Sequence, residues 1–191
     1  TINGNQNLTI TASGTTTLSG AVGGTSALAS LTSNGGSTTV LNGSTITTTG
    51  AQTLTDAVTL GIDTTLSGTN INFASTVNGS SADTESLTIT GNVDFNGIVG
   101  GSTSLEFLTV SGTTSLDGGN VTTAGIQTFT GATTLGADAT LSGTNVSFVS
   151  TLNGAQNLTI SASGLTSFGS TVGNSAALTS LTTDASGTVA F

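Results

Sequence analysis

Apolar and polar residues alternate in short stretches along the whole chain, as in Leu8–Ile10, Val58–Leu60, Ile71–Phe73 and Leu87–Ile89. Alternation with a period of two predicts β-strands of about three to six residues with one buried face. Asn-Gly and Ser-Gly pairs separate these stretches, and both residue types adopt the backbone angles that tight turns need. No stretch has the apolar spacing of three and four that a helix requires. We therefore expect an all-β fold without helix.

The pattern restarts at positions 1, 76 and 151 of the sequence. The tetrapeptide Thr1–Gly4 returns as Thr76–Gly79 and again as Thr151–Gly154. Internal repetition at a fixed period is the signature of stacked architectures, so it bears on the fold before any local pattern does. We expect a single domain over residues 1–191 that contains copies 1–75, 76–150 and a partial copy, 151–191.

The long repeat separates the two all-β architectures that remain. A closed barrel or sandwich of hairpins has no reason to restart its sequence, whereas a solenoid stacks like segments on like segments. We therefore predict a parallel β-helix, or β-solenoid, in which coils follow one another about 4.8 Å apart. Each 75-residue copy is expected to make about four coils.

The amino-acid composition excludes most kinds of catalytic and binding site. Thr, Ser and Gly supply 44, 26 and 28 of the 191 residues, and Lys, Arg, His, Cys, Pro, Met, Trp and Tyr are absent. Without His, Cys or Lys the chain lacks the usual activated nucleophiles, disulfides and imidazole or thiolate ligands. Without cations, a net charge of −9 repels phosphate. No apolar run approaches the roughly 20 residues of a membrane helix. We therefore expect a non-enzymatic protein with no nucleic-acid partner and no membrane insertion.

Several short motifs recur and resemble a known class of sequence. They are Thr-Leu-Ser-Gly at 17–20, 65–68 and 140–143, Asn-Leu-Thr-Ile at 7–10 and 157–160, and the related pair Gly50–Leu54 and Gly125–Phe129. The chain resembles the β-strand repeat regions of large bacterial surface proteins, namely filamentous-haemagglutinin-like adhesins and autotransporter passengers. The resemblance implies a right-handed β-helix, export to the cell surface or the medium, and a role as stalk, adhesin or fibre.

The nine acidic residues offer the only candidate metal ligands. Asp63 and Asp138 occupy the same place in successive copies and are the best candidates for Ca²⁺, which takes carboxylate and carbonyl oxygens. Asp83 and Glu85, in an inserted segment, come next. No EF-hand spacing is present, so we favour solvated turn carboxylates and no bound cofactor. A carboxylate pair for glycoside hydrolysis is disfavoured because the acids are scattered and no Trp or Tyr platform exists.

Threonine recurs at alternate positions. The pairs are Thr9 and Thr11, Thr15 and Thr17, Thr47 and Thr49, and Thr88 and Thr90. Such hydroxyl and methyl groups could form a flat array, which resembles the ice-binding face of some β-solenoid antifreeze proteins. A regular face would need one pair in every coil, and the pairs are irregular in the sequence. We therefore interpret these threonines as ordinary outward-facing strand residues.

Asparagine begins six Asn-x-Ser/Thr sequences, at Asn7, Asn42, Asn78, Asn120, Asn145 and Asn157. Chance alone produces many such sequences in a Thr-rich chain, so they do not establish glycosylation. We expect instead that turn asparagines connect neighbouring coils in ladders.

These observations favour a structural segment of an exported bacterial β-solenoid that builds a fibre, sheath or adhesin stalk. Neither end has a polar cap, so we expect Ile2, Val189 and Phe191 to be buried at an end-to-end junction, with further repeats of the same chain or with a second copy. The alternative is a carbohydrate- or ice-binding β-solenoid module, for which surface glycans would be partners. A solenoid hydrolase is the third class.

Overall fold

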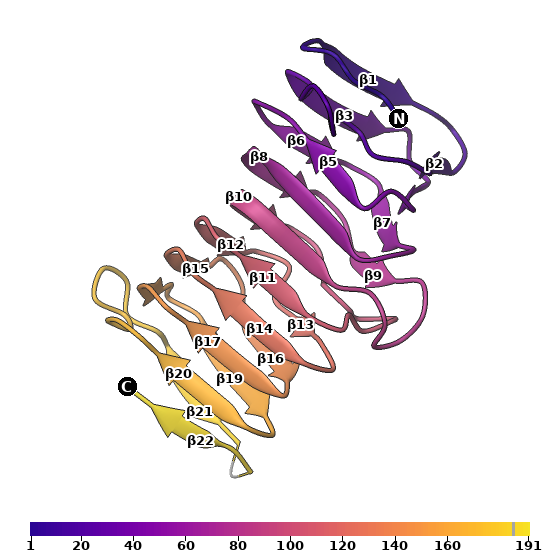
Figure 1. The fold of residues 1–191 in the computed structure, drawn as a ribbon. Helices are drawn as coiled ribbons and strands as arrows, with labels where there is room; N and C mark the ends of the chain where they lie inside the picture. Colours follow the sequence, from indigo (N-terminus) through magenta and orange to yellow (C-terminus); the bar gives the residue numbers. More distant parts are fainter. Residues whose placement is uncertain (185) are drawn as a thin grey trace.

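The computed structural model describes residues 1–184 and 186–191, which contain parallel β-strands and no helix. The strands stack in chain order from one end of a rod to the other (Figure 1). Each coil passes through three columns of strands in a fixed order, here numbered first, second and third. The chain is therefore a parallel β-solenoid, as the sequence predicts.

The first column is built from eight parallel segments, joined by the ladders of neighbouring coils. They are β5 (Thr45–Thr47), the first half of β8 (Thr64–Phe73), the first half of β10 (Leu87–Phe95), β11 (Leu108–Val110), β14 (Ile126–Phe129), β17 (Asn145–Phe148), β20 (Leu165–Phe168) and β22 (Thr188–Ala190).

The second column follows directly along each coil. It contains β1 (Asn7–Thr11), β3 (Ser30–Asn34), β6 (Gln52–Leu54), the second halves of β8 and β10, β12 (Thr114–Leu116), β15 (Thr133–Leu135) and β18 (Leu152–Asn153). In β8 and β10 the first and second columns form one continuous strand, and the register of this pair shifts between Thr90 and Asn92.

The third column closes each coil. It contains β2 (Thr16–Leu18), β4 (Thr38–Leu41), β7 (Ala57–Leu60), β9 (Val77–Gly79), β13 (Val121–Thr122), β16 (Ala139–Gly143), β19 (Asn157–Ala162) and β21 (Ser180–Thr183). Isolated parallel bridges from Val77 to Val99 and from Val99 to Val121 join β9 to β13.

Coils differ in length although their strands stay in register. The coil that runs from Leu8 to its partner Leu31 is longer than the coil that runs from Gln52 to its partner Ile71. The extra residues of the longer coils lie in surface loops between the columns, because strand pairing fixes only the length of the strands. About nine coils result, which at roughly 4.8 Å each give a rod about 40 Å long.

One 75-residue copy makes slightly fewer than four coils. Three coils of the second column separate Gln52 from Thr114, through the successive partners Ile71 and Val93. The chain then passes through the third column at Val121 and reaches the first column at Gln127, which is the counterpart of Gln52. The copy therefore spans three and two-thirds coils, and equivalent residues of successive copies lie in different columns.

Apolar side chains fill the interior along the whole rod. In the first column Phe129, Phe148, Phe168 and Phe191 form a continuous stack with ring centroids 5.2–5.6 Å apart. Phe73 and Phe95 form a second stack, at 5.3 Å, in the second column. Like side chains stack because parallel coils place them directly above one another, so a narrow core needs few aromatic residues.

A buried glutamine closes the same turn in two copies. The Gln52 amide donates to the carbonyl oxygens of Ile46 (3.2 Å) and Ser67 (2.9 Å). Gln127 donates in the same way to Val121 (3.3 Å) and Ser142 (2.8 Å). Each glutamine thus binds its own coil to the next one by satisfying turn carbonyls in the interior.

Candidate functional site: an outward threonine array

The two calcium candidates lie at different corners of the rod. Asp63 follows the third column and leads into the first, whereas Asp138 follows the second column and leads into the third. Each carboxylate accepts a hydrogen bond from a backbone N–H of the next coil, from Ser86 (2.8 Å) and Asn157 (2.8 Å) respectively. The bonds from Asn157 hold the pKa of Asp138 below its usual range. Both residues connect coils.

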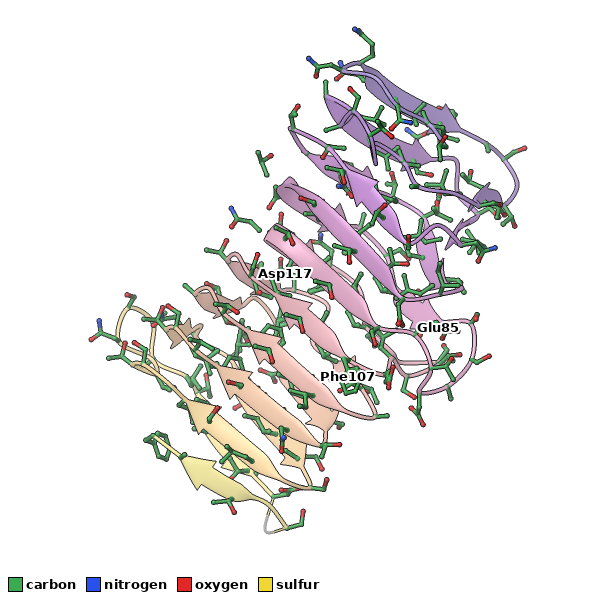
Figure 2. The ribbon with its side chains drawn as sticks, in the orientation of Figure 1. Glu85, Phe107 and Asp117 are labelled. Atoms are coloured by element: carbon green, nitrogen blue, oxygen red, sulfur yellow. The ribbon has the colours of Figure 1, made fainter. Side chains whose placement is uncertain are left out.

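The inserted segment 80–86 places Glu85 in a buried position. Burial raises the pKa of this carboxyl, but hydrogen bonds, first the one from the Ser80 hydroxyl (2.7 Å), outweigh burial and leave the pKa lowered. Asp83 has a positive φ of 63° and accepts a hydrogen bond from the Ser104 hydroxyl. Figure 2 shows Glu85 near one edge of the strands and Asp117 near the opposite edge.

The described residues contain no group of three or more acidic side chains that could hold a metal ion. They also form no pocket. The calcium prediction for Asp63 and Asp138 therefore gains no support from the structure. Among the same residues, no helix is long and apolar enough to cross a membrane.

Asparagine side chains connect neighbouring coils, but the four clearest examples lie in strands β9, β17, β1 and β19 and not in turns, where they were expected. Asn78 accepts a hydrogen bond from the backbone N–H of Ser102 (2.9 Å), and Asn145 accepts one from Leu165 (2.7 Å). Asn7 and Asn157 accept bonds from serine hydroxyls of the following coil, at 2.8 and 2.7 Å. These side chains satisfy backbone and side-chain donors of the following coil and so add to the strand ladders.

The predicted junction residues all belong to the first column. Ile2 bridges to Val22 at one end of the rod, and Val189 in β22 pairs with Thr166 at the other. Phe191 is 88% exposed and stacks on Phe168 at a centroid distance of 5.2 Å. It therefore extends the interior aromatic stack at that end of the described chain.

The predicted threonine pairs do not share a surface. Thr9 and Thr11 belong to the second column, and Thr15 and Thr17 border or lie in the third. Thr88 and Thr90 point outward from the first column. Thr47 also lies in the first column, but Thr49 lies beyond the strand, where its hydroxyl donates to the carbonyl oxygen of Leu28 (3.4 Å).

A regular array becomes visible once the register is known. On five consecutive coils the first column presents two outward hydroxyl residues, here called the threonine array. Its members are Thr45 and Thr47, Thr65 and Ser67, Thr88 and Thr90, Thr109 and Ser111, and Thr128 and Thr130. Between each pair lies a buried apolar residue: Ile46, Leu66, Ile89, Val110 and Phe129 in turn. The spacing of these residues in the sequence is irregular, as expected, but strand pairing stacks them in one column as outward-facing strand residues.

Strand pairing aligns both rows of the array. In the first row Thr45 pairs with Thr65, Thr65 with Thr88, Thr88 with Thr109 and Thr109 with Thr128. In the second row Thr47 pairs with Ser67 and Ser67 with Thr90. Hydrogen bonds from the backbone N–H groups of Ser111 and Thr130 to the preceding coils, at 3.0 and 2.9 Å, continue that row.

The array side chains remain available to solvent. All ten are at least partly exposed. Within the described part of the chain, none of the eight threonine hydroxyls makes a hydrogen bond to protein, and the Ser111 hydroxyl accepts one from the Gly91 N–H (3.2 Å). On the following two coils the rows continue as Ser147 with Val149 and Ser167 with Gly169, so the second row loses its hydroxyl groups there.

An apolar row lies beside the array at the corner that leads into the first column. Phe107 and Ile126 occupy this position on adjacent coils and are 39% and 41% exposed. Figure 2 shows Phe107 on the outer surface of the rod. Gly125 leaves room for the Phe107 ring, because a Cβ atom at Gly125 would collide with it.

Comparison of the chain with protein-family models, with curated proteins and with solved structures finds no match.

Proposed function

We propose that this chain is a structural, non-enzymatic segment of an exported bacterial β-solenoid, which forms a fibre, sheath or adhesin stalk and is extended end to end. The observation that carries the proposal is that successive 75-residue copies join without a break in strand pairing. Pairs such as Val58 with Val77, and Thr133 with Leu152, cross the copy boundaries with ordinary parallel register. The resemblance to bacterial surface repeats supports the cell surface or the medium as its location.

Because copies join without a break, the length of the rod increases with the number of copies. Each copy contributes three and two-thirds coils, so an added copy lengthens the rod by about 18 Å at roughly 4.8 Å per coil. It adds no new kind of interface, because each coil contacts only its neighbours. A stalk requires this property, since it must hold a distant group away from a surface by a set length.

Strand pairing inside the rod supports extension. β8 and β10 each pair with a strand of the preceding coil on one edge and with a strand of the following coil on the other. Each coil is therefore a template for the next. In the proposed fibre, more of the same polypeptide or a second copy continues these ladders and covers Phe191.

The order of columns sets the geometry of a junction between copies. Phe191 closes the first column, so the next strand of a continuing coil belongs to the second column, next to Val172. A second copy begins with Ile2 in its own first column. Seamless continuation therefore requires the second copy to be rotated by about one third of a turn about the rod axis.

Sedimentation velocity and electron microscopy of the 191-residue chain test this proposal. We expect rods that lengthen with protein concentration at constant width. Phe191→Asp should suppress the lengthening, because it places a charge in the apolar junction. Val149→Asp is the matched control: it adds the same charge at a side-chain position that is 50% exposed on the flank of the rod, and should still associate. Stable monomers of the unmodified chain at high concentration would contradict an open-ended fibre.

A further inference from the structure

We propose that the threonine array of the first column is an ice-binding surface. This is a second function, separate from the role of the rod as a stalk. The occupant is the surface of an ice crystal, which is uncharged, flat on the scale of the array and periodic in two directions.

The array is periodic in two directions. Its members repeat along the rod at the coil spacing of about 4.8 Å, and the two residues of each pair lie about 6.6 Å apart along their strand, which is twice the rise per strand residue. Each threonine presents one methyl and one hydroxyl group. Because none of the eight threonine hydroxyls is engaged by the described protein groups, all of them can hold water molecules at these regular positions.

The array is also held rigidly before any binding occurs. Threonine is β-branched, so few side-chain rotamers are open to it. Parallel ladders fix the backbone beneath it from Thr45 to Thr128, and the buried apolar residues between the rows anchor each strand in the core. Little conformational entropy remains to be lost when an ordered surface binds.

Other classes of occupant fit this surface less well. The rows carry no charged side chain, so they offer nothing specific to an ion or a phosphate. They contain no Tyr or Trp and form no pocket in the described residues, so they lack the platform that sugar rings use. Protein interfaces are organised around buried aromatic or arginine anchors, and the array rows contain neither type. A repeating hydroxyl-methyl lattice suits a repeating partner.

The test measures thermal hysteresis, the gap between the melting and freezing points of ice in a solution of the full chain, together with inhibition of ice recrystallisation. The unmodified chain should show both effects. Thr109→Tyr places a bulky ring in the centre of the array and should abolish most of the hysteresis. Tyrosine keeps a hydroxyl group and suits a strand, so the fold should persist, as a circular dichroism spectrum will show.

Thr134→Tyr is the matched control. Like Thr109, Thr134 is the exposed middle residue of a three-residue strand with buried neighbours, but it belongs to the second column. Its hysteresis should equal that of the unmodified chain.

A variant that gains hysteresis shows that the array acts directly, because misfolding could only reduce hysteresis. Val149→Thr restores the second-row hydroxyl on the sixth coil and should increase hysteresis. An inactive unmodified chain would overturn the proposal, as would equal losses in the two tyrosine variants or no gain from Val149→Thr. None of these results would affect the evidence for the rod.

Discussion

At the scale of single residues, glycine permits the close approach of successive coils. Gly68, Gly91, Gly112 and Gly131 lie at the bend between the first and second columns, on four consecutive coils. A Cβ atom at Gly112 would collide with the backbone of Gly91, and one at Gly131 would collide with Gly112. The Gly112 N–H donates to the Gly91 carbonyl oxygen (3.0 Å), so the two backbones have little freedom to separate.

Gly112→Ala should therefore destabilise the rod by roughly 1–3 kcal/mol, the usual cost of inserting a methyl group where there is no space. Gly14→Ala is the control, because a Cβ atom at Gly14 would meet no atom within 4 Å. Denaturant unfolding measures both. Equal stabilities of the two variants would show that the bend tolerates side chains.

The sequence shows which single residues are equivalent in the repeat, but it does not show where each of them lies on the rod. Residues such as Asp63 and Asp138 are equivalent in the repeat, yet the structure places them at different corners because a copy spans a non-integral number of coils. Their shared role, a hydrogen bond to the next coil, follows from local sequence and survives this rotation.

At the scale of elements, the strands are short and gain their stability from stacking across coils. The Phe129, Phe148 and Phe168 rings lie in β14, β17 and β20, and each contacts the ring of the adjacent coil. Phe148 is almost fully buried and has an aromatic neighbour on both sides. It is therefore the residue at which the stack can best be interrupted.

Phe148→Ala should lower the free energy of unfolding by about 3–5 kcal/mol, as expected when a large aromatic residue is removed from a packed core. Phe107→Ala removes the same side chain from the outer surface, where it is 39% exposed, and should cost much less. Thermal and denaturant unfolding compare the two variants. A similar loss in both would mean that the interior stack contributes no more than a surface ring.

The strands could be predicted from the alternation of residues, whereas their neighbours across coils could not. Coil length varies along the rod, since the coil between Gln52 and Ile71 is shorter than the coil between Leu8 and Leu31. Threonines that stack in space, such as Thr88 and Thr109, therefore have no constant spacing in the sequence. The sequence alone therefore does not reveal the array, although its Thr-x-Thr and Thr-x-Ser pairs are visible.

At the scale of the whole molecule, the structure is a rod whose copies turn as they advance. Because a copy fills three and two-thirds coils, each new copy presents its corners one third of a turn away from the previous one. Three copies, or eleven coils, return the same residues to the same column. A rod of many such copies would distribute every surface feature of the repeat evenly around the rod axis.

Extending the rod by one copy tests most directly whether successive copies stack into one continuous solenoid. A second copy of residues 76–150 is inserted after Ser150, and small-angle X-ray scattering measures length and cross-section beside the unmodified chain. We expect an increase of about 18 Å in the maximum dimension, at roughly 4.8 Å for each of three and two-thirds coils, with an unchanged cross-sectional radius. A thicker particle, or one that does not lengthen by this amount, would contradict continuous stacking.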